Sequence, residues 1–155
     1  MPALGPRGEG WVVLQGVLFG AIVAAGWLGP AWPSAWQPWL RVASVISGAL
    51  GALLAVDGVR HLGGSLTPFP KPAEGSSLRE GGVYRLVRHP IYGGVLLLSL
   101  AWTLWSSAVA LVPSLLLAAL FEGKRHREEA WLVGRYPGYE GYRRRVRCRF
   151  IPFLW

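Results

Sequence analysis

The chain has 155 residues, of which 52% are hydrophobic and only 15% are charged. Soluble domains carry about 25% charged residues, so this composition disfavours a soluble globular protein and favours a small membrane protein. The single cysteine, Cys148, excludes an internal disulfide framework and a cysteine-based zinc site, and we expect no metal. The net charge of +8 suits either nucleic acid or an anionic membrane. Because the basic residues lie beside apolar runs, we expect the anionic cytoplasmic leaflet as the partner, and no nucleic acid.

Two apolar runs occupy the first third of the chain. The run from Trp11 to Leu28 contains no charged residue and is long enough to cross a bilayer at about 1.5 Å per residue. An uncharged turn at 29–38, rich in proline and tryptophan, is typical of an interfacial loop. The second run extends from Trp39 to Val56. Its small residues share a face that another helix can approach closely: Ser44, Ser47, Gly48, Gly51 and Ala52.

A polar connector at 57–90 follows the second run. The prolines of its 67–75 segment exclude regular helix and central strand, so we expect an extended loop there. The chain is therefore expected to have two parts. Residues 1–56 would form two transmembrane helices, and residues 57–155 would form a core with the connector, a helical hairpin and a basic C-terminal segment.

Two further apolar runs, Ile91–Trp105 and Ala108–Phe121, are separated only by the serine pair at 106–107. Together they are too long for one ordinary span, and each alone is somewhat short. They form either one long tilted helix or a tight helical hairpin, and Pro113 together with the serine pair favours the hairpin. The fourth helix would continue past the membrane to about Gly134, because helix-forming residues dominate that stretch.

Basic residues are concentrated in two stretches. The 57–90 connector and the 122–149 tail hold fourteen of the sixteen lysines and arginines, whereas the 29–38 loop and the serine pair hold none. Positive residues favour the cytoplasmic side. The distribution therefore predicts an all-α integral membrane protein with four transmembrane helices, both termini in the cytoplasm and a cytoplasmic C-terminal helical segment.

The first candidate site lies where the connector meets the third apolar run. Pro90 suits the first turn of a helix, and Arg85, Arg88 and His89 stand immediately before it. The free N–H groups at such a helix start suit a carboxylate or a phosphate. Each glycine of the pair 93–94 costs about 1 kcal/mol relative to alanine, which indicates a close approach to that backbone. The alternative is that these basic residues only orient the chain in the membrane.

Two further clusters lie on the predicted cytoplasmic side. Arg125 and Glu129 are four residues apart, so they form either a solvated ion pair or an inward-facing carboxylate that holds a ribose, an amino group or a sulfonium. Tyr139 and Tyr142 can pack over an adenine ring or a cationic sulfur. The main role of the five arginines within 143–149 is interpreted as attracting this segment to the anionic leaflet.

Taken in order, these motifs resemble a known family of membrane enzymes. The stretch at 82–94 (Gly-Val-Tyr-Arg-Leu-Val-Arg-His-Pro-Ile-Tyr-Gly-Gly), the Arg-Glu-Glu-Ala-Trp-Leu at 127–132 and the three spaced tyrosines at 136–142 before Arg-Phe-Ile-Pro resemble isoprenylcysteine carboxyl methyltransferases. Phospholipid N-methyltransferases share the Arg-His-Pro and Glu-Glu signatures. The resemblance covers about residues 58–153, so the first apolar run carries none of it.

The resemblance implies a membrane methyltransferase that depends on S-adenosyl-L-methionine. Its acceptor would be a lipophilic small molecule or lipid, an amine or a carboxylate, reached from the bilayer, and residues 57–155 would be the methyltransferase core. Arg125 and Glu129 are the implied catalytic residues that position the acceptor. The implied cofactor-binding residues are His89, Pro90, Tyr92, Gly93, Gly94, Glu128, Glu129, Tyr139 and Tyr142.

Two alternatives accompany this hypothesis. One is an NADPH-dependent membrane reductase of the sterol-reductase type, which has a similar Arg-x-Pro-x-Tyr turn and a tyrosine-rich tail. The other is a non-enzymatic membrane scaffold whose arginines orient it and recruit anionic lipid. The Glu-Glu pair favours methyl transfer over the reductase.

Overall fold

The computed structural model describes residues 7–71, 75 and 77–155. Across these residues the regular structure is entirely helical, with five α-helices and three short 3-10 turns, and the predicted all-α class is confirmed. The α-helices are α1 (Glu9–Leu28), α2 (Gln37–Leu62), α3 (Pro90–Trp105), α4 (Leu111–Arg135) and α5 (Tyr139–Arg145). The 3-10 turns are η1 (Gly63–Ser65), η2 (Gly82–Arg85) and η3 (Ala108–Ala110).

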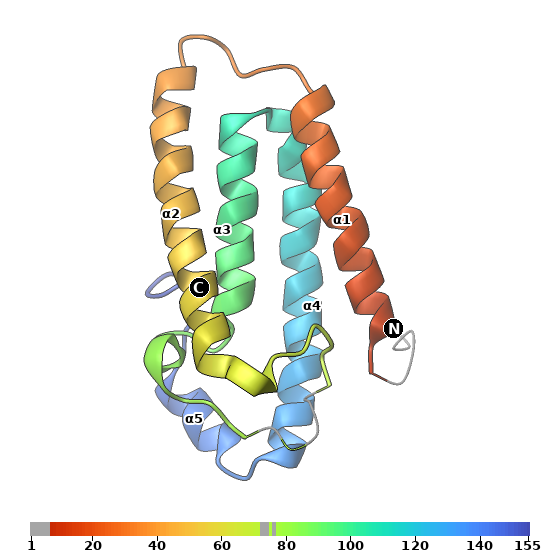
Figure 1. The fold of residues 1–155 in the computed structure, drawn as a ribbon, viewed down its shortest axis with the longest axis vertical. Helices are drawn as coiled ribbons and strands as arrows, with labels where there is room; N and C mark the ends of the chain where they lie inside the picture. Colours follow the sequence, from red (N-terminus) through yellow and green to blue (C-terminus); the bar gives the residue numbers. More distant parts are fainter. Residues whose placement is uncertain (1–6, 72–74, 76) are drawn as a thin grey trace.

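The four long helices lie side by side in the order α2, α3, α4, α1 (Figure 1). The most extensive packing joins α2 to α3, while α1 packs mainly on α4. The α1–α2 loop and the α3–α4 turn share one end of the bundle (Figure 1). The connector, α5 and the start of α1 lie toward the other end, so the predicted site motifs are gathered there.

The small-residue face of α2 is what allows α3 to pack closely. Ser44 and Ser47 donate side-chain hydrogen bonds to carbonyl oxygens of α3, at 2.7 and 2.8 Å. A Cβ atom added to Gly51 would lie 2.8 Å from the carbonyl oxygen of Gly94, so no larger residue fits there. The predicted contact face is confirmed for these residues, whereas Ala52 is exposed and takes no part in it.

A tight turn separates α3 from α4, so the single-helix alternative is wrong. The Ser107 hydroxyl accepts a hydrogen bond from the Val109 amide at 3.3 Å and donates one to the Pro30 carbonyl at 2.7 Å. This serine therefore starts η3 and also ties the turn to the α1–α2 loop. Pro113 lies in the first turn of α4, where a missing N–H breaks no helical hydrogen bond.

One predicted boundary needs correction. The second helix continues to Leu62 rather than ending at Val56, because its last turns hold an Asp57–His61 ion pair at 3.3 Å and place basic residues at the negative end of the helix dipole. Of the predicted 67–75 loop, residues 72–74 lie outside the described part of the chain. Residues 67–71 form neither helix nor strand.

Among the described residues, two helical stretches are long and apolar enough to cross a membrane, α1 and Gln37–Ser65, and α3 is apolar but shorter. Large apolar side chains stay exposed along α1 and α2, including Val13, Val17, Trp27, Trp39, Val45 and Leu53. Soluble monomers rarely expose apolar surface on this scale, which is the surface that lipid chains would cover.

A buried cluster connects the bundle to the C-terminal segment. Leu18 and Ile22 of α1 pack with Leu117 and Phe121 of α4, and Phe150 from the C-terminal segment joins them. A second cluster around the tyrosines of α5 packs against the end of α4. These two clusters fix α4, α5 and the C-terminal segment around the start of α3.

Candidate functional site

The C-terminal segment pairs with the residues just before α3. The amide of Arg88 donates to the carbonyl of Cys148 at 3.1 Å, and the amide of His89 donates to the carbonyl of Arg149 at 2.8 Å. Phe150 is fully buried and its ring lies 6.2 Å from the His89 ring. Two segments about sixty residues apart in the sequence therefore hold Arg88 and His89 in one place.

The glycine pair at the start of α3 is explained by helix packing. A Cβ atom on Gly93 would collide with the carbonyl group of Phe150. A Cβ atom on Gly94 would lie 2.7 Å from both Ala55 and the carbonyl oxygen of Gly51 on α2. The predicted close approach is present, but its partners are protein groups. Neither glycine lines a cavity, and their role in binding a cofactor stays a prediction.

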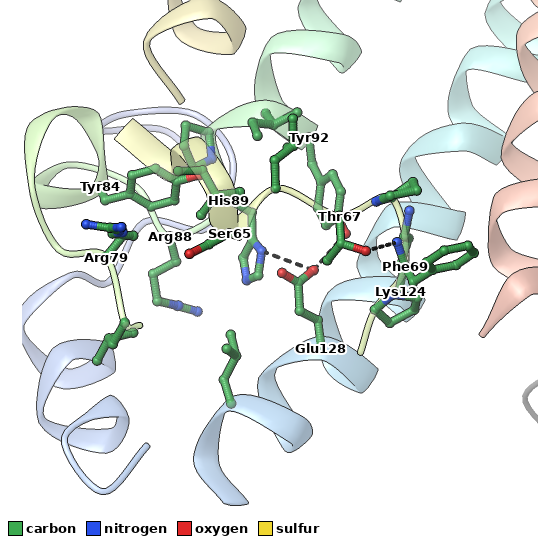
Figure 2. Close-up of a pocket in the computed structure, with 18 of the residues that line it drawn as sticks. Ser65, Thr67, Phe69, Arg79, Tyr84, Arg88, His89, Tyr92, Lys124 and Glu128 are labelled. Atoms are coloured by element: carbon green, nitrogen blue, oxygen red, sulfur yellow. Dashed lines mark hydrogen bonds and ion pairs between the residues drawn. The ribbon is translucent and has the colours of Figure 1, made fainter. Parts of the chain in front are cut away.

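A cavity of about 350 Å³ lies between the connector, the start of α3, α4 and α5. The residues labelled in Figure 2 line it from the connector, the start of α3 and α4. Six of the predicted cofactor-binding residues line it: His89, Pro90, Tyr92, Glu128, Tyr139 and Tyr142. Arg125 and Glu129, the predicted positioning pair, do not line this cavity and lie at a second one instead.

One wall of the cavity carries a fixed carboxylate. The Tyr92 hydroxyl donates to Glu128 Oε2 at 2.7 Å, and His89 Nδ1 lies 3.8 Å from the same oxygen. The His89 and Tyr92 rings stack, with centroids 5.5 Å apart and planes within 3°. Figure 2 shows the Glu128 carboxylate directed at the neighbouring His89 ring. Since the Glu128 side chain keeps 26% of its surface exposed, its oxygens remain accessible to a bound molecule.

The adjacent Glu129 does not line this cavity and pairs with basic side chains. Its Oε1 accepts hydrogen bonds from Arg88 Nε at 2.9 Å and His89 Nε2 at 3.0 Å, while Oε2 lies 3.0 Å from Arg125 Nη1. Burial raises the pKa of Glu129, but the hydrogen bonds and charges of His89 and Arg88 outweigh it and hold the pKa at about 2. An ionised carboxylate only accepts, so His89 carries its proton on Nε2 toward Glu129. Glu129 thus fixes the orientation of both basic residues.

Three further tyrosines, Tyr84, Tyr139 and Tyr142, also line the cavity. Tyr142 donates its hydroxyl hydrogen to the Tyr84 carbonyl at 2.8 Å, and Tyr84 donates to the Gly58 carbonyl at 3.3 Å. The Tyr139 hydroxyl is buried and has no hydrogen-bond partner among the described residues. Burial raises the pKa of Tyr139, so the hydroxyl keeps its proton and remains a donor. A buried unpaired hydroxyl costs about 1–3 kcal/mol, which a ligand acceptor would offset.

Lys124 lines the cavity but was not among the predicted site residues. Its ammonium group is buried, donates to Gln15 Oε1 of α1 at 2.8 Å and lies 5.2 Å from the centre of the Tyr92 ring. Burial lowers the pKa of Lys124 to about 8, against the raising effect of Glu128. The signal was available, since Lys124 is four residues from Glu128 and shares its helix face. Nothing in the sequence indicated Gln15.

Connector residues also line the cavity without having been predicted, including Thr67, Phe69 and Arg79 (Figure 2).

A sequence model of the phospholipid methyltransferase family matches residues 39–138. The chain belongs to this family. It is therefore a membrane methyltransferase, and neither the reductase nor the scaffold alternative agrees with this membership. The matched range includes the connector, α3 and α4, whereas Gln15, Tyr139 and Tyr142 lie outside it.

Proposed function

We propose that the protein is an S-adenosyl-L-methionine-dependent methyltransferase whose cofactor binds in the cavity beside His89. The observation that carries this proposal is the cavity lined both by Tyr139, whose buried hydroxyl has no hydrogen-bond partner among the described residues, and by Glu128, whose carboxylate is partly exposed. Its volume of about 350 Å³ falls in the range of about 300–1,000 Å³ usual for small-ligand sites.

The chemistry of the lining fits this cofactor. S-adenosyl-L-methionine supplies an activated methyl group on a positively charged sulfur, together with an adenine ring, a ribose, an amino group and a carboxylate. Tyr92 and Tyr142 offer flat aromatic surfaces to a ring or a cationic group. Glu128 offers a carboxylate to a hydroxyl or an ammonium, and Tyr139 offers a donor to an acceptor atom. Arg79 offers a positive charge to a carboxylate.

We propose an amino group on a lipid as the methyl acceptor. An amine reacts only after it loses a proton, and Glu128, fixed by Tyr92, is a base on the cavity wall that can accept it. The apolar lining extends along Val95 and Phe121 into the hydrophobic part of the bundle, which suits a lipophilic acceptor that arrives from the bilayer. Glu129 and Arg125 would then act as positioning residues, because they orient His89 and Arg88 from outside the cavity.

The acceptor is tested by methyl transfer from radiolabelled S-adenosyl-L-methionine in detergent-solubilised protein. We expect phosphatidylethanolamine to be methylated and a farnesylcysteine carboxylate not to be. Glu128→Gln should lower kcat about 100-fold, the lower end for the loss of a general base, whereas the matched surface variant Glu140→Gln should not. Methylation of the carboxylate acceptor alone would contradict the amine proposal.

We further propose four membrane spans with both termini on the cytoplasmic side. Support comes from the concentration of fourteen basic residues in the connector and tail, which lie at one end of the bundle (Figure 1). A reporter that is active only in the cytoplasm, fused after Trp155, should be active. An inactive fusion at this position, together with activity when the same reporter is placed in the 29–38 loop, would reverse the orientation.

A further inference from the structure

A second cavity lies beyond Glu129, outside the proposed methyl-transfer site. It measures about 670 Å³ and is formed by α4, α5 and the C-terminal segment. Five arginines line it: Arg88, Arg125, Arg143, Arg147 and Arg149. Of the carboxylates in the described residues, Glu129 and Glu140 line it with them. The cavity therefore carries an excess of positive charge that the methyl-transfer proposal does not use.

The carboxylates near this cavity are already shared among several cations. Glu129 accepts from three basic side chains, and Arg143 lies 4.0 Å from its Oε2. Outside the lining, Glu122 pairs with both Arg125 and Arg149, at 2.6 and 2.9 Å. Within the described residues, no acceptor contacts the guanidinium group of Arg147. The charges of Arg143 and Arg147 are thus the least neutralised ones in the cavity.

The arrangement differs from a diffuse basic surface because its base is rigid. Arg88 and Arg125 are 8% and 4% exposed and are held by Glu129, while Arg88 also donates to the carbonyls of Val146 and Arg147. The exposed guanidinium groups of Arg143 and Arg147 complete the rim from α5 and the following segment. Guanidinium groups fixed around a hollow are suited to bidentate recognition of phosphate.

The position of the cavity indicates the source of the phosphate. Arg125 is four residues beyond Phe121, the last residue of the apolar run, so it lies about 6 Å farther along the helix axis. The polar headgroup layer on each side of the hydrocarbon core is about 5–8 Å thick. The buried base of the cavity is therefore at the level of lipid headgroups if α4 emerges from the membrane near Phe121.

We propose that this five-arginine cavity is a binding site for a phosphate monoester group, with an anionic lipid headgroup as its source. Binding at this site requires no methyl transfer and no cofactor. The proposal therefore stands or fails independently of the function proposed above.

The test uses the full-length protein in detergent and measures binding of dioctanoyl phosphatidic acid by microscale thermophoresis. The cavity variant is Arg143→Gln with Arg147→Gln. The control variant is Arg127→Gln with Arg144→Gln, which removes the same charge from exposed residues outside the cavity. We expect the cavity variant to weaken binding about tenfold or more, the loss expected for one or more charge-assisted hydrogen bonds, and the control to stay within about twofold.

Glycerol 3-phosphate and dioctanoyl phosphatidylcholine complete the experiment. Tighter binding of phosphatidic acid than of glycerol 3-phosphate supports a lipid source. Equal binding of the two, with the same sensitivity to the cavity variant, supports the phosphate site and assigns it to a soluble ligand. The proposal is overturned if neither phosphate monoester binds, if phosphatidylcholine binds as tightly, or if both variants weaken binding equally.

Discussion

Glu128 and Glu129 are adjacent in the sequence and take different parts in the structure. Successive residues on an α-helix point about 100° apart, so adjacent side chains can face different surroundings. Glu128 faces the proposed cofactor cavity and keeps an accessible carboxylate, whereas Glu129 is buried among Arg88, His89 and Arg125. The sequence identified the pair but did not distinguish the two residues, because the choice depends on where the C-terminal segment and Arg88 lie.

Glu129→Gln is expected to destabilise the protein strongly. It leaves Arg88 and Arg125 buried without their counter-charge, and breaking such a buried pair costs about 3 kcal/mol or more. Thermal unfolding in detergent should show a clear fall in Tm. Glu140→Gln is the matched control, since Glu140 is exposed and, among the described residues, pairs with Arg144 at 3.7 Å. Equal Tm values for the two variants would contradict the assigned role.

The low pKa of Glu129 predicts that the stability of the protein depends on pH. The pKa of Glu129 is about 2 in the folded protein against an ordinary value of 4.5, because its basic neighbours favour the ionised form. Its stabilising contribution is therefore complete above about pH 4.5 and is lost as the pH falls through about 2. The difference in unfolding free energy between wild type and Glu129→Gln should be constant above pH 5 and shrink below it. A difference that is constant down to pH 2 would contradict the low pKa.

Tyr139→Phe separates stability from ligand binding. Removing a buried hydroxyl that has no partner in the described part of the chain should leave the ligand-free protein as stable or more stable, by up to about 1 kcal/mol. The same change should weaken S-adenosylhomocysteine binding about fivefold, since a neutral hydrogen bond contributes about 1 kcal/mol. Tyr142→Phe is the comparison, because its hydroxyl already donates to the Tyr84 carbonyl and its loss should lower Tm. An unchanged affinity of Tyr139→Phe for S-adenosylhomocysteine would show that this hydroxyl does not bind the ligand.

At the scale of elements, the C-terminal segment completes the site by lying against the start of α3. Gly93→Ala is expected to displace it, because the new methyl group would collide with the Phe150 carbonyl. Hydrogen exchange should then increase at residues 146–150, and S-adenosylhomocysteine affinity should fall with it. Gly134→Ala is the control in the exposed last part of α4, where the added methyl group meets no neighbour and should stabilise the helix by about 1 kcal/mol. Unchanged exchange at 146–150 in Gly93→Ala would contradict the account.

Local features of the fold were predictable from the sequence. Pro90 starts α3, Ser44 and Ser47 face α3, and the serine pair at 106–107 separates two helices, because each effect depends on residues within one or two turns. The pairing of Arg88 and His89 with the C-terminal segment was not predictable. It consists of backbone hydrogen bonds between residues about sixty positions apart, and no side-chain pattern or spacing indicates such bonds.

At the scale of the whole molecule, the family match and the cavity have different extents. The match ends at residue 138, yet the cavity is completed by Tyr139 and Tyr142 of α5 and by Gln15 of α1. The elements within the match supply His89, Tyr92 and Glu128. Residues outside the match therefore complete the lining of the cavity.

The most direct test of the account is a titration of the detergent-purified protein with S-adenosylhomocysteine and, separately, with NADPH. We predict that S-adenosylhomocysteine binds and NADPH does not, and that Glu128→Gln weakens the binding about tenfold, as expected for the loss of a charge-assisted hydrogen bond. Binding of NADPH without S-adenosylhomocysteine, or affinity unaffected by Glu128→Gln, would contradict the cofactor site proposed here.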